Sequence, residues 1–214
     1  MERSYQRESD ETDRLVTLSD GVIAIAITLL VLEITVPEVP AGGSTADLPR
    51  LILEQWPDFL AYVLSFLVIG LYWSLHRRTF IHISRHDRGL VWLNLLFLLM
   101  VAFIPYGTSL FSRSPGRFGV MFYAGVLALT GLSLAVLWAY ASQQDLIEAG
   151  LGSRTVLLQS ARFLISPLVF LLSIGVAVVD PTLAILTWVL LLPLNAVFQS
   201  RIVESLEAPN KNSR

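Results

Sequence analysis

The side chains best suited to chemistry lie at the start of one apolar segment, RLVTLSDGVIAIAITLLVLEI, which begins at Arg14. Ser19 and Asp20 precede an apolar run in which Thr28 carries the one hydroxyl. A carboxylate about one turn inside a membrane helix is expensive unless it points into the protein and finds donors. The alternative is a charge near a helix N-terminus that water solvates at the interface. Both interpretations of Asp20 stay open, and the donors that could reach it are Arg14, His76 and Asn94.

A second group of reactive side chains lies in the polar stretch HRRTFIHISRHDR, which contains His76, His82, His86 and Asp87. The histidine spacing of six and four lacks the regularity of H-E-x-x-H, and only His82 and His86 would share a helix face. The absence of cysteine excludes thiolate metal sites and cysteine catalysis. We therefore expect no enzyme, no resident metal and no cofactor. Without a basic tail or an aromatic–basic surface stretch, nucleic acid is not an expected partner.

Helical periodicity places the apolar side chains of the first segment on one stripe. Each residue advances about 100° around a helix, so Leu18 and Leu32 lie about 20° from Ile25, Leu29 about 40° and Thr28 about 60°. The serine and aspartate at the foot of the helix lie about 120° and 140° away, so they face different surroundings. Such a stripe is usually a packing surface, and a threonine can bond a carbonyl of its own helix.

Length and composition indicate an integral membrane protein made of helices. Of the 214 residues, 54% are hydrophobic and 15% are charged, against about 45–50% and 25% in soluble domains. Apolar blocks of about 20 residues span a bilayer, and in lipid the backbone of such a block must be helical. We predict an all-α domain over 13–205, with disordered ends at 1–12 and 206–214. Its six predicted spans are 16–36, 54–77, 88–110, 118–142, 156–179 and 182–203.

The distribution of cationic residues predicts the orientation. Six spans place both termini on one side, and that side collects all the arginines and lysines except Arg50, Arg113 and Arg117. Because cytoplasmic loops are rich in Lys and Arg, both termini are expected in the cytoplasm of a multi-pass protein of the cell membrane. The side chains expected at the membrane interface are Trp56, Trp73, Trp92 and Trp138, with Arg162 snorkelling out of the fifth span.

The first apolar segment resembles a known family. Its motif R-x-x-x-L-S-D, which begins at Arg14 and is followed by GVIAIAITLLVLEI, is similar to the R-x-x-x-F-S-D opening of the bacterial relatives of the lysosomal and endosomal potassium channel, the transmembrane protein 175 family. The stretches YWSLHRRTF (72–80) and LNLLFLLMVAFIPY (93–106) resemble the second and third spans of that family. The resemblance covers residues 12–110, and beyond them it extends only to hydrophobicity and span count. Leu18 stands where the family has Phe, so an aromatic packing role there is in doubt.

The resemblance implies a homotetramer of six-helix subunits whose first helices line a central pore for potassium and other monovalent cations. In that family a hydrophobic constriction replaces a carbonyl filter. A ring of isoleucines offers no ligands to a dehydrated ion, so modest selectivity for potassium over sodium is expected. The implied pore residues are Ile25, Thr28, Leu29 and Leu32, which periodicity also places on one stripe. The implied structural support consists of Arg14, Ser19, Asp20, Trp73, His76 and Asn94.

An alternative function is a proton-coupled secondary transporter that uses Asp20 and His76 as a relay. Transporters often show two repeated halves and interrupted spans around a central site. Pro105, Pro167 and Pro193 interrupt predicted spans, but the two halves of this chain do not resemble each other. A current that rises linearly with voltage and does not saturate with substrate would favour the channel.

Overall fold

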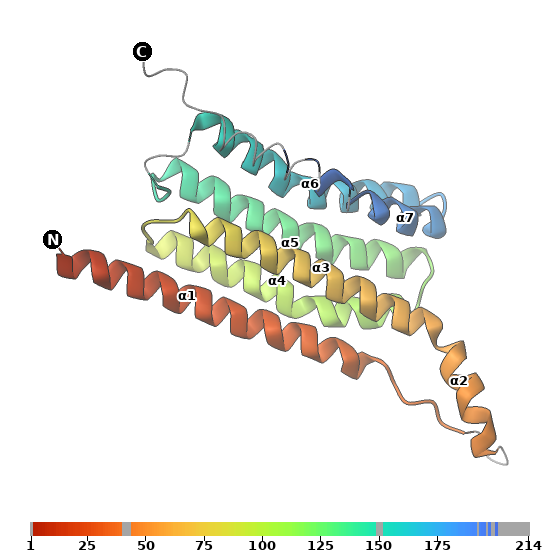
Figure 1. Cartoon of the computed structure of the whole chain (residues 1–214). Coiled ribbons are helices and arrows are strands. Elements are labelled where there is room, and N and C mark those ends of the chain that lie inside the picture. The colour runs from red at the N-terminus through yellow and green to blue at the C-terminus, as the bar shows by residue number, and fades with distance from the viewer. Residues whose placement is uncertain are drawn as a thin grey trace.

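Five long helices form the bundle seen in the computed structural model (Figure 1). The structure describes residues 2–39, 44–148, 152–191, 193–195, 197 and 200, with residues 2–11, 153 and 154 described as backbone only. The long helices are α1 (Glu2–Leu29), α3 (Trp56–Ile81), α4 (Arg88–Arg113), α5 (Arg117–Gln143) and α6 (Ser153–Ala177). The short elements are α2 (Leu48–Glu54), α7 (Pro181–Thr187) and the 3-10 turns η1 (Leu30–Glu33), η2 (Thr45–Asp47) and η3 (Trp188–Leu190). The predicted all-α class is confirmed.

All five long helices are long and apolar enough to cross a membrane. A helix satisfies its backbone groups internally, which a lipid environment requires. Each of the five overlaps one of the first five predicted spans. α7 and η3 occupy the beginning of the sixth predicted span, 182–203, and much of its remainder lies outside the described residues. The apolar parts of the five helices are 12–33, 56–81, 88–113, 117–143 and 155–177.

The first helix extends further toward the N-terminus than the sequence predicts. α1 begins at Glu2, so the backbone of residues 2–12 is helical, whereas the sequence predicts disorder over 1–12. Glu, Arg and Gln have good helix propensity. The apolar helix that follows also supplies the nucleus, so each residue added before it gains a hydrogen bond without a new nucleation step. The tail predicted over 206–214 lies outside the described residues.

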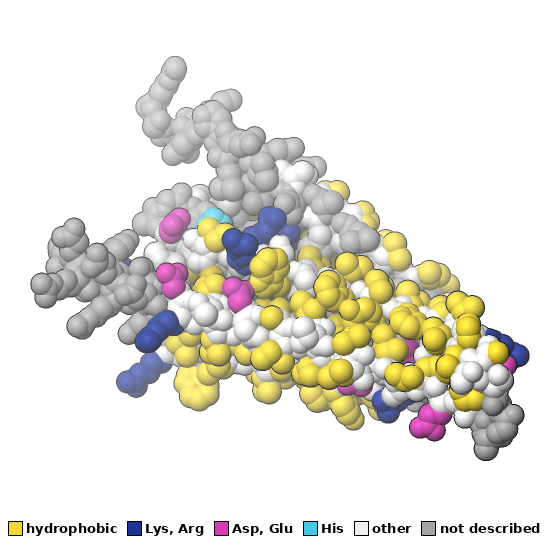
Figure 2. Space-filling view, turned by 60° about the horizontal axis from the view of Figure 1, so that its bottom comes forward, with side chains coloured by type: hydrophobic (Ala, Val, Ile, Leu, Met, Phe, Trp, Pro, Cys, Tyr) yellow, Lys and Arg dark blue, Asp and Glu magenta, His cyan; other side chains and the backbone are white. Residues whose placement is uncertain are grey.

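The helices alternate in direction. α1, α4 and α6 run one way along the bundle, and α3 and α5 run the other way (Figure 1). The start of α1 and the α3–α4 and α5–α6 connections therefore share one end, which we name the basic end. Charged side chains lie mainly toward the two ends of the face seen in Figure 2, and hydrophobic ones cover the middle. The cations described at the basic end include Arg14, Arg77, Arg78, Arg85 and Arg88.

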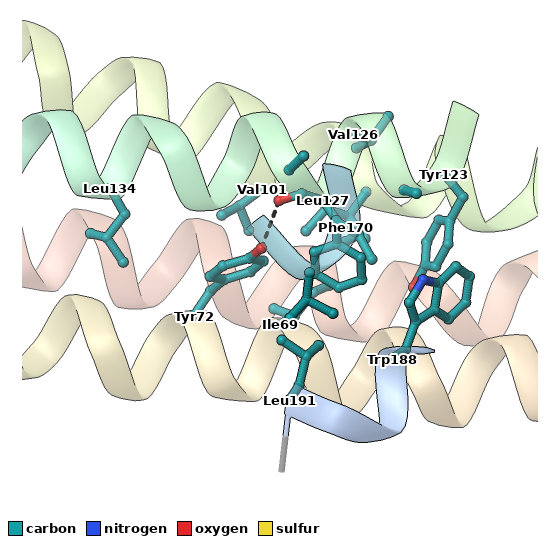
Figure 3. Packing of buried hydrophobic residues seen from close by; sticks show 14 of the residues in the cluster. Ile69, Tyr72, Val101, Tyr123, Val126, Leu127, Leu134, Phe170, Trp188 and Leu191 are labelled. Atoms are coloured by element: carbon teal, nitrogen blue, oxygen red, sulfur yellow. Dashed lines mark hydrogen bonds between the residues drawn. The ribbon is translucent and has the colours of Figure 1, made fainter. Parts of the chain in front are cut away.

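α5 forms the centre of the bundle. In its most apolar window 61% of the residues are buried, against 22% for α1. Several buried hydroxyl groups in this core are hydrogen-bonded, which offsets the cost of burying them away from water. The Tyr72 hydroxyl donates to the Leu127 carbonyl oxygen at 2.6 Å (Figure 3). The Ser65 hydroxyl oxygen lies 2.8 Å from that of Thr108 and 2.7 Å from that of Tyr123. These bonds tie α3 to α4 and α5.

Two side chains predicted at the membrane interface are buried instead. Trp138 is 1% exposed, and its indole N–H donates to the Ser160 hydroxyl at 3.0 Å across the α5–α6 contact. Arg162 is 3% exposed, because its face of α6 packs against the bundle. Both predictions were wrong, since hydropathy indicates the depth of a residue but not which neighbour covers it. Trp56 and Trp92 are 64% and 72% exposed.

Candidate functional site

One narrow face of α1 anchors it to the bundle. Ser19, Ile23, Ala26 and Leu30 recur at intervals of four, three and four residues, and each is at most 2% exposed. Helical periodicity places residues at these intervals on one side of the helix. This side packs on α3 and α4. The small serine and alanine allow the helices to approach closely.

The side of α1 opposite this face is exposed. Ile25 is 60% exposed, Leu29 42% and Leu32 72%, and Thr28 is also exposed. Leu18, 47% exposed, continues this stripe toward the basic end. Three of the residues implied as the pore lining therefore lie on the exposed side of α1, and the fourth, Leu32, lies in η1, which directly follows it.

The Thr28 hydroxyl has a defined orientation. It donates its proton to the carbonyl oxygen of Ile25 at 2.8 Å. A hydroxyl has one proton and two lone pairs. Because the proton is used inside the helix, the exposed oxygen acts toward its surroundings as an acceptor or a cation ligand.

Three of the residues implied as support form one buried network. The Asn94 amide N–H donates to the Ser19 hydroxyl oxygen at 3.0 Å, and Ser19 donates to the Leu15 carbonyl at 2.8 Å. The Asn94 amide oxygen accepts from His76 Nε2 at 2.8 Å. Ser19, His76 and Asn94 are all 0% exposed. The His76 ring stacks on Phe97, with centroids 5.2 Å apart. This network joins α1, α3 and α4 through side chains alone.

Asp20 belongs to a separate group. It is exposed, and its Oδ1 accepts from the Trp73 indole N–H at 2.8 Å. The guanidinium carbon of Arg77 lies 5.8 Å from the Trp73 ring centroid, within the range of a cation–π contact. Of the donors considered from the sequence, His76 and Asn94 bond each other instead. Asp20 thus combines the two open interpretations, because it is solvated and yet tied to α3. From the sequence, Trp73 was expected by its depth and among the implied supports, but it was not named as a donor to Asp20.

Arg14 stands apart from both groups among the described contacts. It is exposed and lines a hollow of about 260 Å³ together with Leu15, Leu18, His86 and Val91. The motif of the first helix is therefore divided in space. Its serine and aspartate bond to α4 and α3 respectively, and its arginine faces the surface at the basic end.

The histidines considered for a metal take other roles. Thr12 Oγ1 lies 3.3 Å from His86 Nδ1. Asp87 accepts from the Tyr140 hydroxyl at 2.6 Å and from the Leu90 amide N–H at 2.8 Å. The Tyr140 hydroxyl, followed by the backbone N–H groups at the start of α4, lowers the pKa of the Asp87 carboxyl. Within the described part of the chain, no three His, Asp or Glu residues gather closely enough to hold a metal ion.

Comparison with known proteins extends the resemblance. The sequence profile of the endosomal/lysosomal potassium channel TMEM175 family matches residues 14–105, which contain α1 from Arg14 onward, all of α3 and most of α4. A potassium channel of Streptomyces collinus is 34% identical over 182 residues, 82% of this chain and 87% of that protein. A potassium channel of Chamaesiphon minutus is 36% identical over 151 residues, 69% of this chain and 74% of that protein.

A solved structure is similar over a still longer part of the chain. The crystal structure of a lysosomal potassium-selective channel TMEM175 homologue from Chamaesiphon minutus superposes with a TM-score of 0.76 at 29% identity, covering 90% of this chain and 98% of that one. The human endosomal/lysosomal proton channel TMEM175 is 36% identical over 111 residues, 48% of this chain and 22% of that protein. The match to the bacterial relatives continues well beyond the motif of the first helix. The chain therefore belongs to the TMEM175 family of endosomal/lysosomal potassium channels.

Proposed function

We propose that this chain is one subunit of a potassium-permeable cation channel whose pore is lined by α1. The bacterial relatives that it matches over most of their length are named potassium channels. The observation that carries the proposal is the uncovered face of α1. α1 is the least buried of the five candidate spans. Its exposed side nevertheless carries an apolar stripe and the outward-facing hydroxyl oxygen of Thr28.

The pore requires several copies of the chain. α1 lies along one edge of the bundle (Figure 1), so one copy cannot surround a passage with that helix. Closed rings are the usual solution for identical subunits that share one interface. We propose a homotetramer, the number that the resemblance implies, with four α1 helices around the axis.

Ile25 would form the constriction in this arrangement. Four isoleucine side chains present no oxygen to an ion. If their ring is narrow, water leaves it and the pore stops conducting, whereas a wider ring would pass hydrated ions. The Thr28 oxygens, one turn further along, could replace part of a hydration shell because their protons are used within the helix. Leu29 and Leu32 would continue the lining. Selectivity for potassium over sodium would then be modest.

The basic end would face the cytoplasm. The excess of arginine there follows the rule for cytoplasmic loops. Both termini would lie on that side of a six-helix subunit, and the protein would reside in the cell membrane. Ser19, Asp20, Trp73, His76 and Asn94 would hold α1 against α3 and α4, so that corresponding residues of the four α1 helices lie at the same depth. Arg14, the sixth support that the resemblance implies, would act at the surface of the basic end.

A proton relay through Asp20 and His76 is less well supported. His76 is buried and bonded to Asn94, whereas Asp20 is exposed and bonded to Trp73. The two groups therefore have separate partners, and a proton passing between them would require these bonds to rearrange. Because some animal relatives are named proton channels, proton permeation still belongs in the test.

The test is a flux assay on purified protein in liposomes, with gradients of K⁺, Na⁺ and H⁺. We expect Ile25→Asn to raise conductance and to reduce the preference for K⁺, because an amide side chain wets the constriction. A change of about tenfold corresponds to about 1.4 kcal/mol of lost barrier. The matched control is Leu99→Asn on α4, where the side chain is also 60% exposed. If the flux of Ile25→Asn equals that of the wild type, Ile25 is not the constriction.

A further inference from the structure

Two adjoining hollows lie at the basic end, one beside the start of α4 and one between α1 and the start of α4. The larger has a volume of about 340 Å³ and is lined by His86, Asp87, Arg88, Val91 and Trp92. The smaller is the hollow of about 260 Å³ beside Arg14. His86 and Val91 line both, so the two adjoin. We name the pair the interfacial groove.

The walls of the interfacial groove are held in place. The bond between Thr12 and His86 joins α1 to the α3–α4 connection beside it. Asp87 caps α4 through the Leu90 N–H and accepts the Tyr140 hydroxyl from α5. Both oxygens of the one acidic side chain that lines the groove are thus engaged within the subunit.

The groove has a cationic rim and an apolar wall. Arg14 and Arg88 are exposed, and each lies in the first part of its membrane helix at the same end of the bundle. Below them lie Leu18 and Trp92, which are 47% and 72% exposed, and the half-buried Val91. Tryptophan is enriched at the level of lipid headgroups, where its ring meets hydrocarbon and its N–H meets water. Cationic pockets between membrane helices on the cytoplasmic side suit anionic headgroups.

We propose that the interfacial groove binds an anionic phospholipid of the cytoplasmic leaflet. Its phosphate would lie between Arg14 and Arg88, with one acyl chain along Val91 and Trp92. Because Arg14 lies on α1, the bound lipid would contact the helix that we propose to line the pore. The site depends on the orientation of the bundle and not on permeation.

The experiment measures how lipids quench Trp92. The full chain is reconstituted in phosphatidylcholine vesicles that contain increasing fractions of phosphatidylglycerol, with bromine on the acyl chains of one lipid at a time. The difference in emission between wild type and Trp92→Phe isolates the signal of Trp92. We expect brominated phosphatidylglycerol to quench this signal at a lower mole fraction than brominated phosphatidylcholine. In Arg14→Gln/Arg88→Gln that preference should fall about fivefold per arginine.

The matched control is Arg113→Gln/Arg117→Gln, which removes two exposed arginines at the opposite end and should keep the preference. Arg88→Gln alone is the second variant, because Arg88 lies outside the motif of the first helix. Equal quenching by the two lipids, or a preference that survives both Arg88→Gln and the double variant, would overturn the proposal. So would the absence of quenching by either lipid, which would mean that a second copy of the chain covers the groove. No ion gradient is involved, so this result is separate from the flux assay.

Discussion

At the scale of residues, Asn94 holds three helices with one amide. It donates to Ser19 on α1 and accepts from His76 on α3, and all three side chains are fully buried. A buried polar group that loses its partner costs about 1–3 kcal/mol. The neighbouring bond from Trp73 to Asp20 lies at the surface, where water can replace either partner. The two groups should therefore contribute very differently to stability.

We expect Asn94→Leu to destabilise the subunit by about 1–3 kcal/mol, because it leaves the His76 N–H without an acceptor in an apolar site. Trp73→Phe and Asp20→Ala should each cost less than about 1 kcal/mol, because their bond is exposed. The measurement is thermal unfolding in detergent, followed by circular dichroism and by gel filtration after heating. Equal losses for Asn94→Leu and Asp20→Ala would contradict the division into two groups.

The sequence predicts positions around α1 better than it predicts partners. Periodicity alone separates the uncovered stripe from Ser19, because the helical repeat is fixed by the backbone. The pairing of Asp20 with Trp73, 53 residues further along, depends on how α3 is rotated against α1. Nothing in the local pattern sets that rotation. For the same reason Trp138 was expected at the interface but lies under α6.

At the scale of elements, α5 and α6 approach each other closely at Gly131. A Cβ atom added there would lie 2.9 Å from Pro167 Cδ and 3.1 Å from the Tyr72 hydroxyl oxygen. The proline ring is rigid, and the tyrosine is held by Leu127 and Ser166. A small residue at a helix crossing in a membrane lets the backbones approach, which strengthens packing where no hydrophobic effect drives association.

We expect Gly131→Ala to destabilise the bundle by about 1–3 kcal/mol, the usual effect of an extra methyl group in a tight core. Gly125→Ala on the same helix is the matched control, because a Cβ atom there meets nothing within 4 Å. It should be neutral or stabilise by up to about 1 kcal/mol through helix propensity. Thermal unfolding of the two variants beside the wild type decides this. If Gly131→Ala unfolds at the same temperature as the wild type, α5 and α6 can move apart at this point without loss of stability, which would contradict the prediction.

The five long helices could be predicted because lipid restricts a spanning backbone to one conformation. Their ends could not, because a helix continues into water wherever propensity permits. α1 thus reaches back to Glu2 and α3 runs on to Ile81, beyond the apolar window on which the predicted span rests. The short α2 also lies in a connection that the prediction left without structure. Hydropathy identifies blocks long enough to span a bilayer, so it carries no information about a helix as short as α2.

At the scale of the whole molecule, α1 is the part that the isolated chain leaves incomplete. Only 22% of its most apolar window is buried, the lowest fraction among the five helices, although it holds the matched family motif. If lipid covered this face, the order in which the polar start of α1, the apolar stripe and the Thr28 hydroxyl follow one another along the helix would have no consequence. If other copies cover it, that order sets which residues meet at the axis.

The chain contains no cysteine, so a single introduced thiol can test which face meets another copy. Ile25 and Leu99 are both 60% exposed on apolar helices of the same subunit. We expect Ile25→Cys to be joined to a second subunit by a short bis-maleimide, because the proposed assembly gathers four such side chains near one axis. Leu99→Cys should stay monomeric on a denaturing gel. Native mass spectrometry of the untreated protein should give four times the 23.8 kDa chain. Cross-linking through Leu99→Cys but not through Ile25→Cys would place α4 at the interface and α1 against lipid, since only thiols facing another copy can be bridged.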